Sequence, residues 1–514
     1  MMYVVHALQV WSVMGVLGCT ACGAETPAQP VMEVPIETAP PDPPISGEIS
    51  NGVELPRQYV DTKMPAESER VLRVAAGGDL QAALHEAKPG DVVELEAGAV
   101  YSGSFTLPAK QGDGWIVIRS SAYARLPEGR RVTPADAPLM AMLVGGESNR
   151  RVLQTAEGAH HYRLIGLEIA LAPAKLPGVV TTIIEFGESG QTLETMPKHL
   201  ILDRSYVHGT PTQSLTRCVT LNSAWSAVIE SYLDECHARG FDSQAIGGWS
   251  GTGPFKIANN FLAGAGENIM FGGAAVGREG MPPSDIEIRG NHIFKPLAWE
   301  KSPWVIKNLL ELKIAERVLI EGNVLENMWA DAQVGFAVNI KSENRNTSTY
   351  PNLATRDVTF RNNRIVNSRF GFTVIGAAST KEKTGEGRTE RVLIENNLLD
   401  VNDRAFQVGG VDNLVIQGNT ASGRVSLEGI IEGFEFRGNL IKGGLKGSGV
   451  PEGVGTLRAR APGGIFTGNA LVGVRASVYP EGNEFPASLE EYRGAAGVNA
   501  ARLGESTAKA VNGQ

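Results

Sequence analysis

The chain has 514 residues, a formal net charge of −9 and 20% charged residues. That length exceeds what one ordinary compact core contains, and it favours several domains or a repeat protein whose units pack only on their neighbours. The acidic balance argues against nucleic-acid binding, which needs a basic face. The 61 glycines and the low aromatic content of 6% are typical of short strands joined by tight turns.

An apolar stretch at residues 3–18 precedes Cys19 and resembles a bacterial secretory signal. The small residue Gly18 makes the junction similar to a lipoprotein cleavage box. We therefore expect residues 1–22 to be a signal peptide of lipoprotein type with Cys19 lipidated, and an ordinary signal peptide is the alternative. Either reading predicts export: an outer-membrane or cell-surface lipoprotein, or otherwise a periplasmic or extracellular protein.

Residues 23–69 form a proline-rich segment. Such a segment buries too little apolar surface to fold, so we expect an extended tether and lead-in. No later segment is long and apolar enough to span a bilayer as a helix. Membrane attachment is therefore expected only through the lipid anchor.

A short helix is predicted where the folded region begins. Asp79 can cap its N-terminus, and Pro89-Gly90 ends it. Its apolar face consists of Leu80, Ala83, Leu84 and Ala87. A strand at residues 92–95 follows, and this order resembles the N-terminal entrance of right-handed parallel β-helix proteins of the pectate-lyase-like superfamily. In that superfamily the helix covers the open end of the solenoid, which would otherwise expose strand edges.

From residue 198 onward one motif recurs: a β-rich strand, an asparagine, two or three apolar residues and a second strand. The asparagine slot is filled by Asn260, Asn291, Asn323, Asn363, Asn397, Asn419, Asn439 and Asn469, with Ser205 and Ser231 in earlier copies. We expect the slot residue to adopt a left-handed conformation at a bend and to hydrogen-bond along the stack. The pattern predicts an all-β fold, a right-handed parallel β-helix over residues 70–482 with a short N-terminal capping helix, then a C-terminal cover and disordered tail at 483–514.

Beyond the leader, the cysteines are Cys218 and Cys236. They do not stack in the repeat alignment, and their spacing does not resemble a metal site. We expect two free, mostly buried thiols.

Strand periodicity predicts which side chains of each second strand face water. The residues expected to point inward are Phe241, Ile269, Leu310, Leu312, Phe336, Val338, Phe372 and Phe406. The outward set is then Asp242, Gln244, Asn268, Lys307, Glu311, Lys313, Asn339, Lys341, Thr373 and Gln407. Since stacked strands lie roughly 4.8 Å apart, these residues would form one polar strip. Neighbouring loops carry Trp249, Trp299, Trp304, Trp329 and Tyr350, which favours either a polysaccharide groove with aromatic walls or simple loop anchors.

Two resemblances bear on function. The segments 264–273, 285–291 and 304–333 resemble, in this order, secreted bacterial β-helix proteins. The tripeptide Glu311-Leu312-Lys313 is similar to the Glu-and-Lys strand of the chondroitinase-B and alginate-lyase family, in which the lysine is the Brønsted base. The Arg-His-Gly segment of that family is absent, which leaves the acid unassigned.

The second resemblance implies a lyase that cleaves a uronate glycan by β-elimination, which needs a base and a positive charge near the substrate carboxylate. Lys313 and Lys341 would lie on adjacent rungs and lower one another's pKa, so that one becomes a neutral base while Glu311 holds the charged partner. The residues expected to bind substrate are Asp242, Gln244, Asn268, Lys307, Asn339, Arg345 and Trp304. Arg217 and Arg345 are either clamps for a substrate carboxylate or simply solvated side chains.

Other readings stay open. An inverting glycoside hydrolase needs two carboxyl groups roughly 6.5–9.5 Å apart, and Asp242 and Glu311, two rungs apart, would be separated by roughly 9.6 Å. A Ca²⁺ ion could use Asp242, Glu267 or Asp331 together with uronate oxygens. A surface solenoid could also bind glycan without turnover. In each case the expected partner is an acidic polysaccharide, and a monomer is the default.

Overall fold

The computed structural model describes residues 49–66, 70–145, 151–172, 179–180, 182–274, 282–345, 350–377 and 387–489. These residues belong to one compact unit, Ala39–Gln514. The predicted signal peptide, Cys19 and most of the tether lie outside the described residues. Within the described ranges, no helix has both the length and the apolar character needed to cross a membrane.

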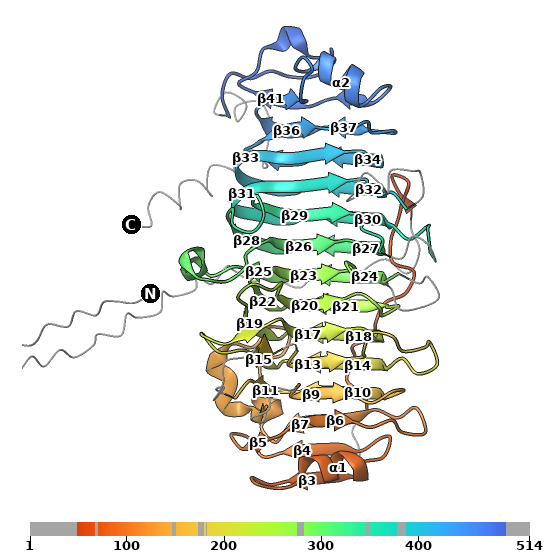
Figure 1. Ribbon diagram of the computed structural model, residues 1–514, viewed down its shortest axis with the longest axis vertical. Helices are drawn as coiled ribbons and strands as arrows, with labels where there is room; N and C mark the ends of the chain where they lie inside the picture. Colours follow the sequence, from red (N-terminus) through yellow and green to blue (C-terminus); the bar gives the residue numbers. More distant parts are fainter. Residues whose placement is uncertain are drawn as a thin grey trace, which may run out of the picture. The chain divides into compact units, whose positions relative to one another are not determined.

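Successive strands pair in parallel with strands one turn of the chain later and so stack into a solenoid (Figure 1). We call one turn of the chain a rung and distinguish three faces. The first face consists of β3 (Val71–Val74), β4 (Val92–Leu95), β7 (Ile116–Ser120), β10 (His160–Ile165), β14 (Lys198–Asp203), β18 (Ala224–Ile229), β21 (Phe255–Ala258), β24 (Ser284–Arg289), β27 (Ala315–Glu321), β30 (Thr355–Arg361), β32 (Glu390–Glu395), β34 (Asp412–Gln417), β37 (Glu435–Arg437) and β40 (Ile465–Thr467).

The other two faces belong to one continuous sheet. The second face consists of β5 (Val100–Ser102), β8 (Ala141–Val144), β11 (Leu167–Ala170), β15 (Tyr206–His208), β19 (Tyr232–Cys236), β22 (Phe261–Gly264), β25 (His292–Phe294), β28 (Val324–Met328), β31 (Arg364–Ile375), β33 (Leu398–Gly409), β35 (Thr420–Ala421), β38 (Leu440–Lys442) and β41 (Ala470–Val472). The third face consists of β6 (Phe105–Leu107), β9 (Leu153–Thr155), β13 (Ile184–Phe186), β17 (Arg217–Leu221), β20 (Gln244–Gly248), β23 (Glu267–Phe271), β26 (Asn308–Leu312), β29 (Phe336–Lys341), β36 (Arg424–Leu427) and β39 (Leu445–Lys446), together with the later parts of β31 and β33. The chain thus forms the right-handed parallel β-helix that its sequence predicts.

Few other elements occur in the described residues. The helix α1 (Leu80–Glu86) lies beside β3 and β6, where Asp79 accepts a hydrogen bond from the Ala82 N–H at 2.9 Å. The helix α2 (Val454–Arg460) lies at the opposite end of the stack (Figure 1). Apart from the hairpin at residues 49–54, the remaining described elements are the β12 (Val179–Val180) and β16 (Ser214–Leu215) pair and the 3₁₀ turns η1 (Tyr123–Arg125), η2 (Pro134–Leu139), η3 (Leu297–Lys301) and η5 (Ala476–Val478).

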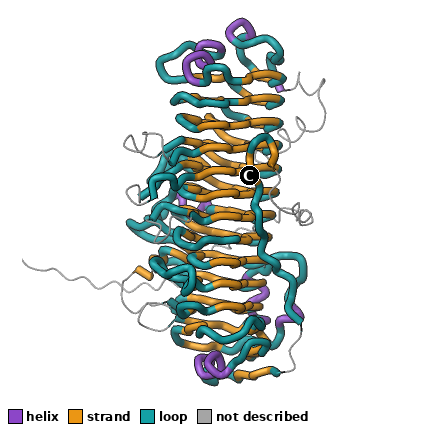
Figure 2. Tube along the Cα trace, turned by 90° about the vertical axis from the view of Figure 1, so that its right-hand side faces the viewer, coloured by secondary structure: helices purple, strands orange, loops and turns teal. Residues whose placement is uncertain are grey.

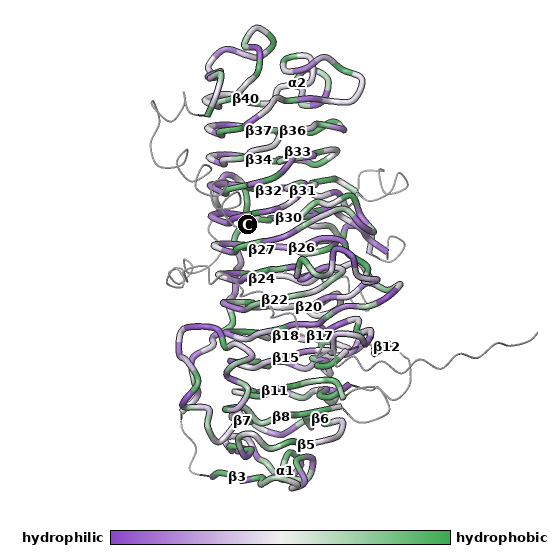
Figure 3. The backbone as a smooth tube through the Cα atoms, turned by 90° about the vertical axis from the view of Figure 1, so that its left-hand side faces the viewer, coloured by the Kyte–Doolittle hydropathy of each residue, from purple (hydrophilic) through white to green (hydrophobic). Residues whose placement is uncertain are grey.

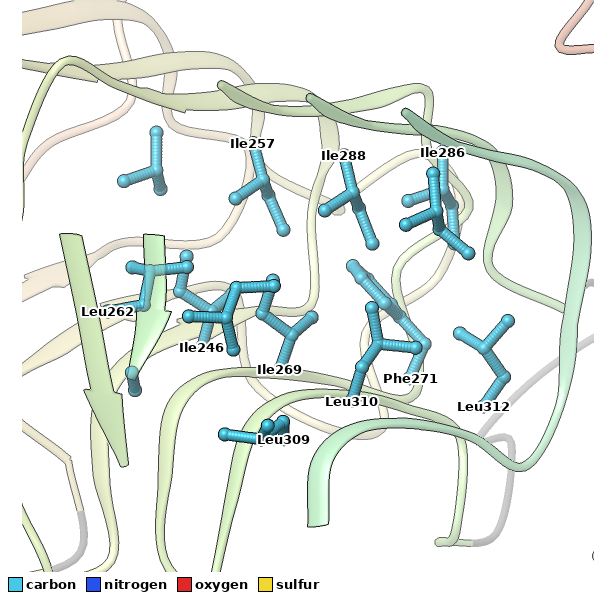
Figure 4. Packing of buried hydrophobic residues seen from close by; sticks show 14 of the residues in the cluster. Ile246, Ile257, Leu262, Ile269, Phe271, Ile286, Ile288, Leu309, Leu310 and Leu312 are labelled. Carbon is cyan, nitrogen blue, oxygen red and sulfur yellow. The ribbon is translucent and has the colours of Figure 1, made fainter. Parts of the chain in front are cut away.

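The interior is built from columns of apolar side chains. Ile246, Ile269 and Leu310 stack on the third face, and Ile257 and Ile288 stack on the first face opposite them (Figure 4). All five are fully buried. Burial of one such side chain contributes roughly 1.5–3 kcal/mol. Hydrophilic and hydrophobic residues are mixed along the rungs (Figure 3), and strands such as β20, β23 and β26 are buried at every position.

An asparagine ladder runs along the bend between the first and second faces. Asn291 Oδ1 accepts hydrogen bonds from the backbone N–H and Nδ2 of Asn260 at 2.9 and 3.0 Å, and Asn291 repeats these bonds with Asn323. The ladder continues through Asn363, Asn397, Asn419, Asn439, Asn469 and Asn483. The left-handed conformation, however, belongs to the residue before the ladder position, as in Asn259 with φ of 54° and Gly290 with φ of 62°. The preceding residue makes the bend, while the ladder asparagine stays outside the left-handed region and aims its amide along the stack.

Residues 49–66 cross the rungs of the first face (red in Figure 1; side view in Figure 2). They start as a hairpin of β1 (Ile49–Ser50) and β2 (Val53–Glu54). Val53 packs on Val415, and Val60 packs on Ile201. The Arg57 N–H donates to Asp285 Oδ1 at 2.8 Å. This part of the predicted lead-in is therefore bound to the solenoid.

Cys218 and Cys236 form a disulfide with their Cα atoms 5.6 Å apart, so the prediction of free thiols is wrong. Cys218 lies on β17 of the third face and Cys236 on β19 of the second face. Both side chains are fully buried. An alignment of residues along one face does not reveal a contact that crosses the interior between two faces.

Candidate functional site

The predicted polar strip lies on β20, β23, β26 and β29 of the third face. One outward column contains Gly247, Met270, Glu311 and Asn339. A second column contains Arg217, Gln244, Glu267 and Asn308. The register therefore brings acidic, basic and amide side chains from neighbouring rungs together, as the alternation in the sequence predicts for the middle of each strand.

Two predicted orientations at the starts of strands are wrong. Phe241, expected in the core, is 55% exposed because β20 begins only at Gln244. Asn268, expected in the strip, turns inward, donates to two backbone carbonyls and accepts a hydrogen bond from Lys295 at 3.0 Å. Glu267 takes the outward position instead. Regular alternation thus begins only after the first residues of β23.

Glu311 is the centre of a group that we call the Glu311 cluster: Glu267, Glu311, Lys313, Asn339 and Lys341. Lys313 Nζ lies 3.1 Å from Glu311 Oε2, and Lys341 Nζ lies 3.2 Å from Glu311 Oε1. Asn339 Nδ2 donates to the same Oε1 at 2.6 Å. The Glu311 side chain is fully buried, whereas the two lysine side chains are 10% and 14% exposed. Two ammonium groups therefore lie between one buried carboxylate and solvent.

Glu267 and Glu311 form a carboxyl pair. Burial raises the pKa of Glu267, and the negative charge of Glu311 raises it further. Burial alone would also raise the pKa of Glu311, but Lys313 and Lys341 outweigh burial, so the net pKa of Glu311 is lowered. Below its pKa of about 7, Glu267 therefore keeps its proton and donates a hydrogen bond to Glu311. Glu267 Oε1 is buried and receives no hydrogen bond from a described donor, whereas Glu311 Oε2 faces Lys313 Nζ at 3.1 Å.

Lys313 is charged at neutral pH. Burial lowers its pKa, but the charges of Glu311 and Glu267 outweigh burial and raise the pKa above its ordinary value. The sequence predicts that Lys341 lowers the pKa of its neighbour until that lysine is neutral. For Lys313 this prediction is wrong, because the carboxylate of Glu311 lies between the two ammonium groups. The absence of a side chain at Gly273 makes room for Lys313, since a Cβ there would lie 2.6 Å from Lys313 Cδ.

Asp242, Gln244 and Lys307 extend the cluster at Glu267. Lys307 Nζ lies 2.5 Å from Asp242 Oδ1 and 3.8 Å from Glu267 Oε1. Gln244 Nε2 donates to Glu267 Oε2 at 2.6 Å. The structure thus connects these three predicted substrate-binding residues to Glu311 through Glu267.

Arg345 and Trp304 do not join these contacts directly. Arg345 is 58% exposed and pairs with Glu343 at 2.6 Å, and Glu343 in turn lies 3.1 Å from Lys341. Trp304 is 6% exposed, and its ring stacks on His237 with the centroids 3.7 Å apart. Trp304 therefore anchors its loop and is not available to a substrate.

Lys295, which sequence reasoning missed, supports the site from inside. Its fully buried Nζ donates to the backbone oxygens of residues 264–266 at 2.6, 2.8 and 3.2 Å and to Asn268. Burial lowers the pKa of Lys295 to about 7, while the four oxygens favour its charged form. The lysine thus fixes the segment that leads directly into Glu267. In the sequence, Lys295 directly follows the apolar strand β25, and this position could have indicated that its side chain is buried.

The residues proposed for Ca²⁺ do not fit that role. In the described part of the chain, no three or more His, Cys, Asp or Glu side chains are grouped to hold a metal ion. Asp242 and Glu267 already face the ammonium of Lys307. Asp331 accepts backbone hydrogen bonds from Ile306 at 3.2 Å and Ala332 at 2.6 Å.

A depression of about 540 Å³ lies where β31 passes from the second face to the third. Trp329, Arg369, Phe370 and Asn402 are among its lining residues. Phe370 packs on Phe336, the first residue of β29, with ring centroids 4.9 Å apart. Trp329 therefore lines a cavity beside the strand that carries Asn339 and Lys341.

No protein-family model and no curated protein matches the chain. The structure is similar to an alginate lyase from Paenibacillus sp. strain FPU-7, with a TM-score of 0.41 and 15% identity, over 71% of this chain and 99% of that chain. It is also similar to a mannuronic acid specific polysaccharide family 6 lyase from human gut microbiota (TM-score 0.43, 14% identity, 87% and 100% covered). A third similar structure is a hyperthermoactive exopolygalacturonase from Thermotoga maritima (TM-score 0.45, 11% identity, 78% and 94% covered). At these identities, function has to be argued from the residues of the site.

Proposed function

We propose that the chain is an exported enzyme that binds an acidic polysaccharide over the Glu311 cluster and cleaves it at a uronate by β-elimination. One observation carries the proposal: Lys313 and Lys341 reach the same buried carboxylate from adjacent rungs, at 3.1 and 3.2 Å. Elimination needs two such groups, a base near C5 and a positive charge beside the uronate carboxylate.

The local charge favours an anionic substrate, although the whole chain has a net charge of −9. The cations of the strip and its rim are Arg217, Lys307, Lys313, Lys341 and Arg345, and the ionised carboxylates are Asp242, Glu311 and Glu343. With Glu267 protonated, five positive charges face three negative ones. The surplus of two positive charges attracts a polyanion.

In the proposed reaction, the base is the fraction of Lys313 that has released its proton to solvent, while Glu311 stays ionised 3.1 Å away. The free amine takes the C5 proton of the substrate, and the C4–O4 bond breaks to leave an unsaturated uronate. The new ammonium of Lys313 then returns its proton to the departing O4. Lys341 neutralises the substrate carboxylate while negative charge develops on it.

The disulfide supports the export part of the proposal, because disulfides persist in oxidising compartments outside the cytosol. The predicted lipid anchor at Cys19 is part of the same proposal. Fractionation of cells that produce wild type or Cys19→Ala tests it. Wild type is expected in the membrane fraction, and the variant is expected to be released; equal distribution of the two would reject the anchor.

Incubation with alginate, polygalacturonate and glycosaminoglycans tests the enzymatic proposal. Wild type is expected to increase the absorbance of unsaturated uronates, and Lys313→Met and Lys341→Met are expected to abolish this increase. Lys256→Met is the matched control, because Lys256 lies on the first face and pairs with Glu287 at 4.0 Å. If wild type forms neither unsaturated uronates nor new reducing ends across the panel, the proposal fails.

One observation favours a second function, glycan binding without turnover: Glu267 and Glu311 are fully buried, and Lys313 is charged at rest. This function predicts retention on polysaccharide affinity gels without product. It also predicts that the double variant Lys313→Met, Lys341→Met is retained as well as wild type.

Hydrolysis agrees less well with the geometry. An inverting hydrolase keeps its carboxyl groups roughly 6.5–9.5 Å apart to admit a water molecule. Glu267 and Glu311 instead share a hydrogen bond, and Asp242 is paired with Lys307 at 2.5 Å.

A further inference from the structure

Arg217 on β17 is a largely buried cation with no carboxylate partner within ion-pair distance among the described residues. Its Nε is buried without a hydrogen-bond acceptor, and Nη1 reaches only Thr216 Oγ1 at 3.5 Å. The acids whose charges act on Arg217 are Glu267, Asp242 and Glu185. Each already has another partner: Glu267 accepts from Gln244 at 2.6 Å, Asp242 pairs with Lys307 at 2.5 Å, and Glu185 pairs with Arg151 at 2.5 Å. Since burying an unpaired charge is costly, the arrangement favours an anion supplied from outside the chain.

Trp249 fixes the orientation of this guanidinium. Arg217 Cζ lies 4.7 Å from the centroid of the indole ring. The indole is held in place because the Trp249 backbone N–H donates to Asn222 at 3.0 Å and Nε1 donates to Ser189 at 2.6 Å. Stacking on one face leaves the N–H edges of the guanidinium free to bind a planar carboxylate with two hydrogen bonds.

The register places Arg217 in line with the Glu311 cluster. Arg217 pairs with Gln244, and Gln244 pairs with Glu267, so Arg217 and Glu267 are two rungs apart, roughly 9.6 Å. The rung between them carries Gln244, which donates to Glu267 at 2.6 Å, and Gly247 in the neighbouring column, which adds no side chain. A pyranose unit of a linear polysaccharide is about as long as the distance between rungs. A chain lying along the stack would therefore place a second carboxylate beside Arg217.

We propose that Arg217 and Trp249 form a subsite for a second uronate carboxylate of the same polysaccharide, three rungs or about three sugar units from the bond cleaved beside Glu311 and Lys313 on the rung of β26. This inference rests on the proposed function for its substrate class. It specifies that the polymer runs along the stack over β17, β20, β23 and β26. It also specifies that oligomers long enough to reach both places bind more tightly than shorter ones.

Calorimetric binding of oligomannuronates and oligogalacturonates of increasing length tests the subsite without requiring turnover. Arg217→Gln is expected to weaken the binding of the long oligomers about 10-fold or more and to leave the disaccharides unchanged. Arg217→Lys is expected to recover part of the loss. Arg437→Gln is the matched control, since Arg437 lies on the first face and is already paired with Glu435 at 2.6 Å.

Two variants of Trp249 distinguish a loss of binding from a loss of folding. Trp249→Phe keeps an aromatic ring and is expected to bind close to wild type, whereas Trp249→Ala is expected to bind the long oligomers more weakly; thermal unfolding verifies that each variant is folded.

Equal affinity of Arg217→Gln and wild type for the long oligomers would overturn the subsite, even if wild type cleaves the polymer. Preference for dextran sulfate over both polyuronates would overturn the carboxylate assignment. Arg217-dependent binding without any product would retain the subsite and reject the proposed elimination.

Discussion

Glu267 donates a hydrogen bond to Glu311 across adjacent rungs, although both carboxyl groups are fully buried. Two carboxylates in direct contact in a buried site repel each other strongly, so one of the two carboxyl groups keeps its proton. Lys313 and Lys341 decide which one, because both ammonium groups contact Glu311. The site therefore holds one exchangeable proton directly behind the proposed base.

Replacing Glu267 with glutamine tests this proton. The amide still donates to Glu311 but does not titrate. Because the pKa of Glu267 is raised above 4.5 in the folded protein, the wild type is destabilised as the pH rises from that value through the folded-state pKa. The free energy of unfolding of Glu267→Gln is expected to gain roughly 1–3 kcal/mol relative to wild type over this range. Urea unfolding at a series of pH values measures the difference, and a difference that does not change with pH would argue against a protonated Glu267.

The pH dependence of elimination follows from Lys313. Its pKa is raised, so the fraction of free amine increases roughly tenfold for each pH unit through the neutral and mildly alkaline range. The rate is expected to rise throughout this range. Lys313→Met is expected to reduce the rate by about 10²–10⁴-fold, while Lys256→Met on the first face leaves it unchanged. A profile with its maximum at acidic pH would instead indicate that a carboxylate is the base.

The disulfide is expected to stabilise the early rungs. It closes a loop with a sequence separation of 18 residues, and constraining such a loop in the unfolded chain contributes about 3 kcal/mol. The double variant Cys218→Ala, Cys236→Ala is expected to lower the free energy of unfolding by about this amount. Chemical unfolding with and without reductant measures it. If reductant destabilises the wild type and the double variant equally, the disulfide does not contribute.

The asparagine ladder makes a separate stability prediction. Asn323 Nδ2 donates to Asn363 Oδ1 and to the Ile288 carbonyl, each at 2.9 Å, and its Oδ1 accepts twice from Asn291. Asn323→Ala leaves buried donors of Asn291 unpaired and is expected to cost about 2–4 kcal/mol. Asn352→Ala, at an exposed position, is the control and is expected to change stability by less than about 0.5 kcal/mol. Similar losses in both variants would mean that the ladder bonds add little.

The fold could be predicted because its signals repeat. The slot that holds Asn323 and the apolar positions such as Ile269 and Leu310 recur on rung after rung, and each copy supports the same register. Mid-strand site residues such as Glu311 and Asn339 were placed correctly for the same reason.

Other features depend on geometry that no repeat encodes. Asn268 turns inward because the buried ammonium of Lys295 binds its amide oxygen. The charge of Lys313 depends on Glu311 lying between two ammonium groups, and the Cys218–Cys236 contact crosses the interior between two faces. These contacts join residues that no single strand pattern relates.

Mass spectrometry of the products from alginate and polygalacturonate tests the central claim most directly. Elimination by Lys313 and Lys341 predicts new ends that are lighter by one water than hydrolysis products and that absorb as unsaturated uronates. These products should be absent with Lys313→Met and present with Lys256→Met. Saturated ends from wild type, or unsaturated products that persist in Lys313→Met, would contradict the account.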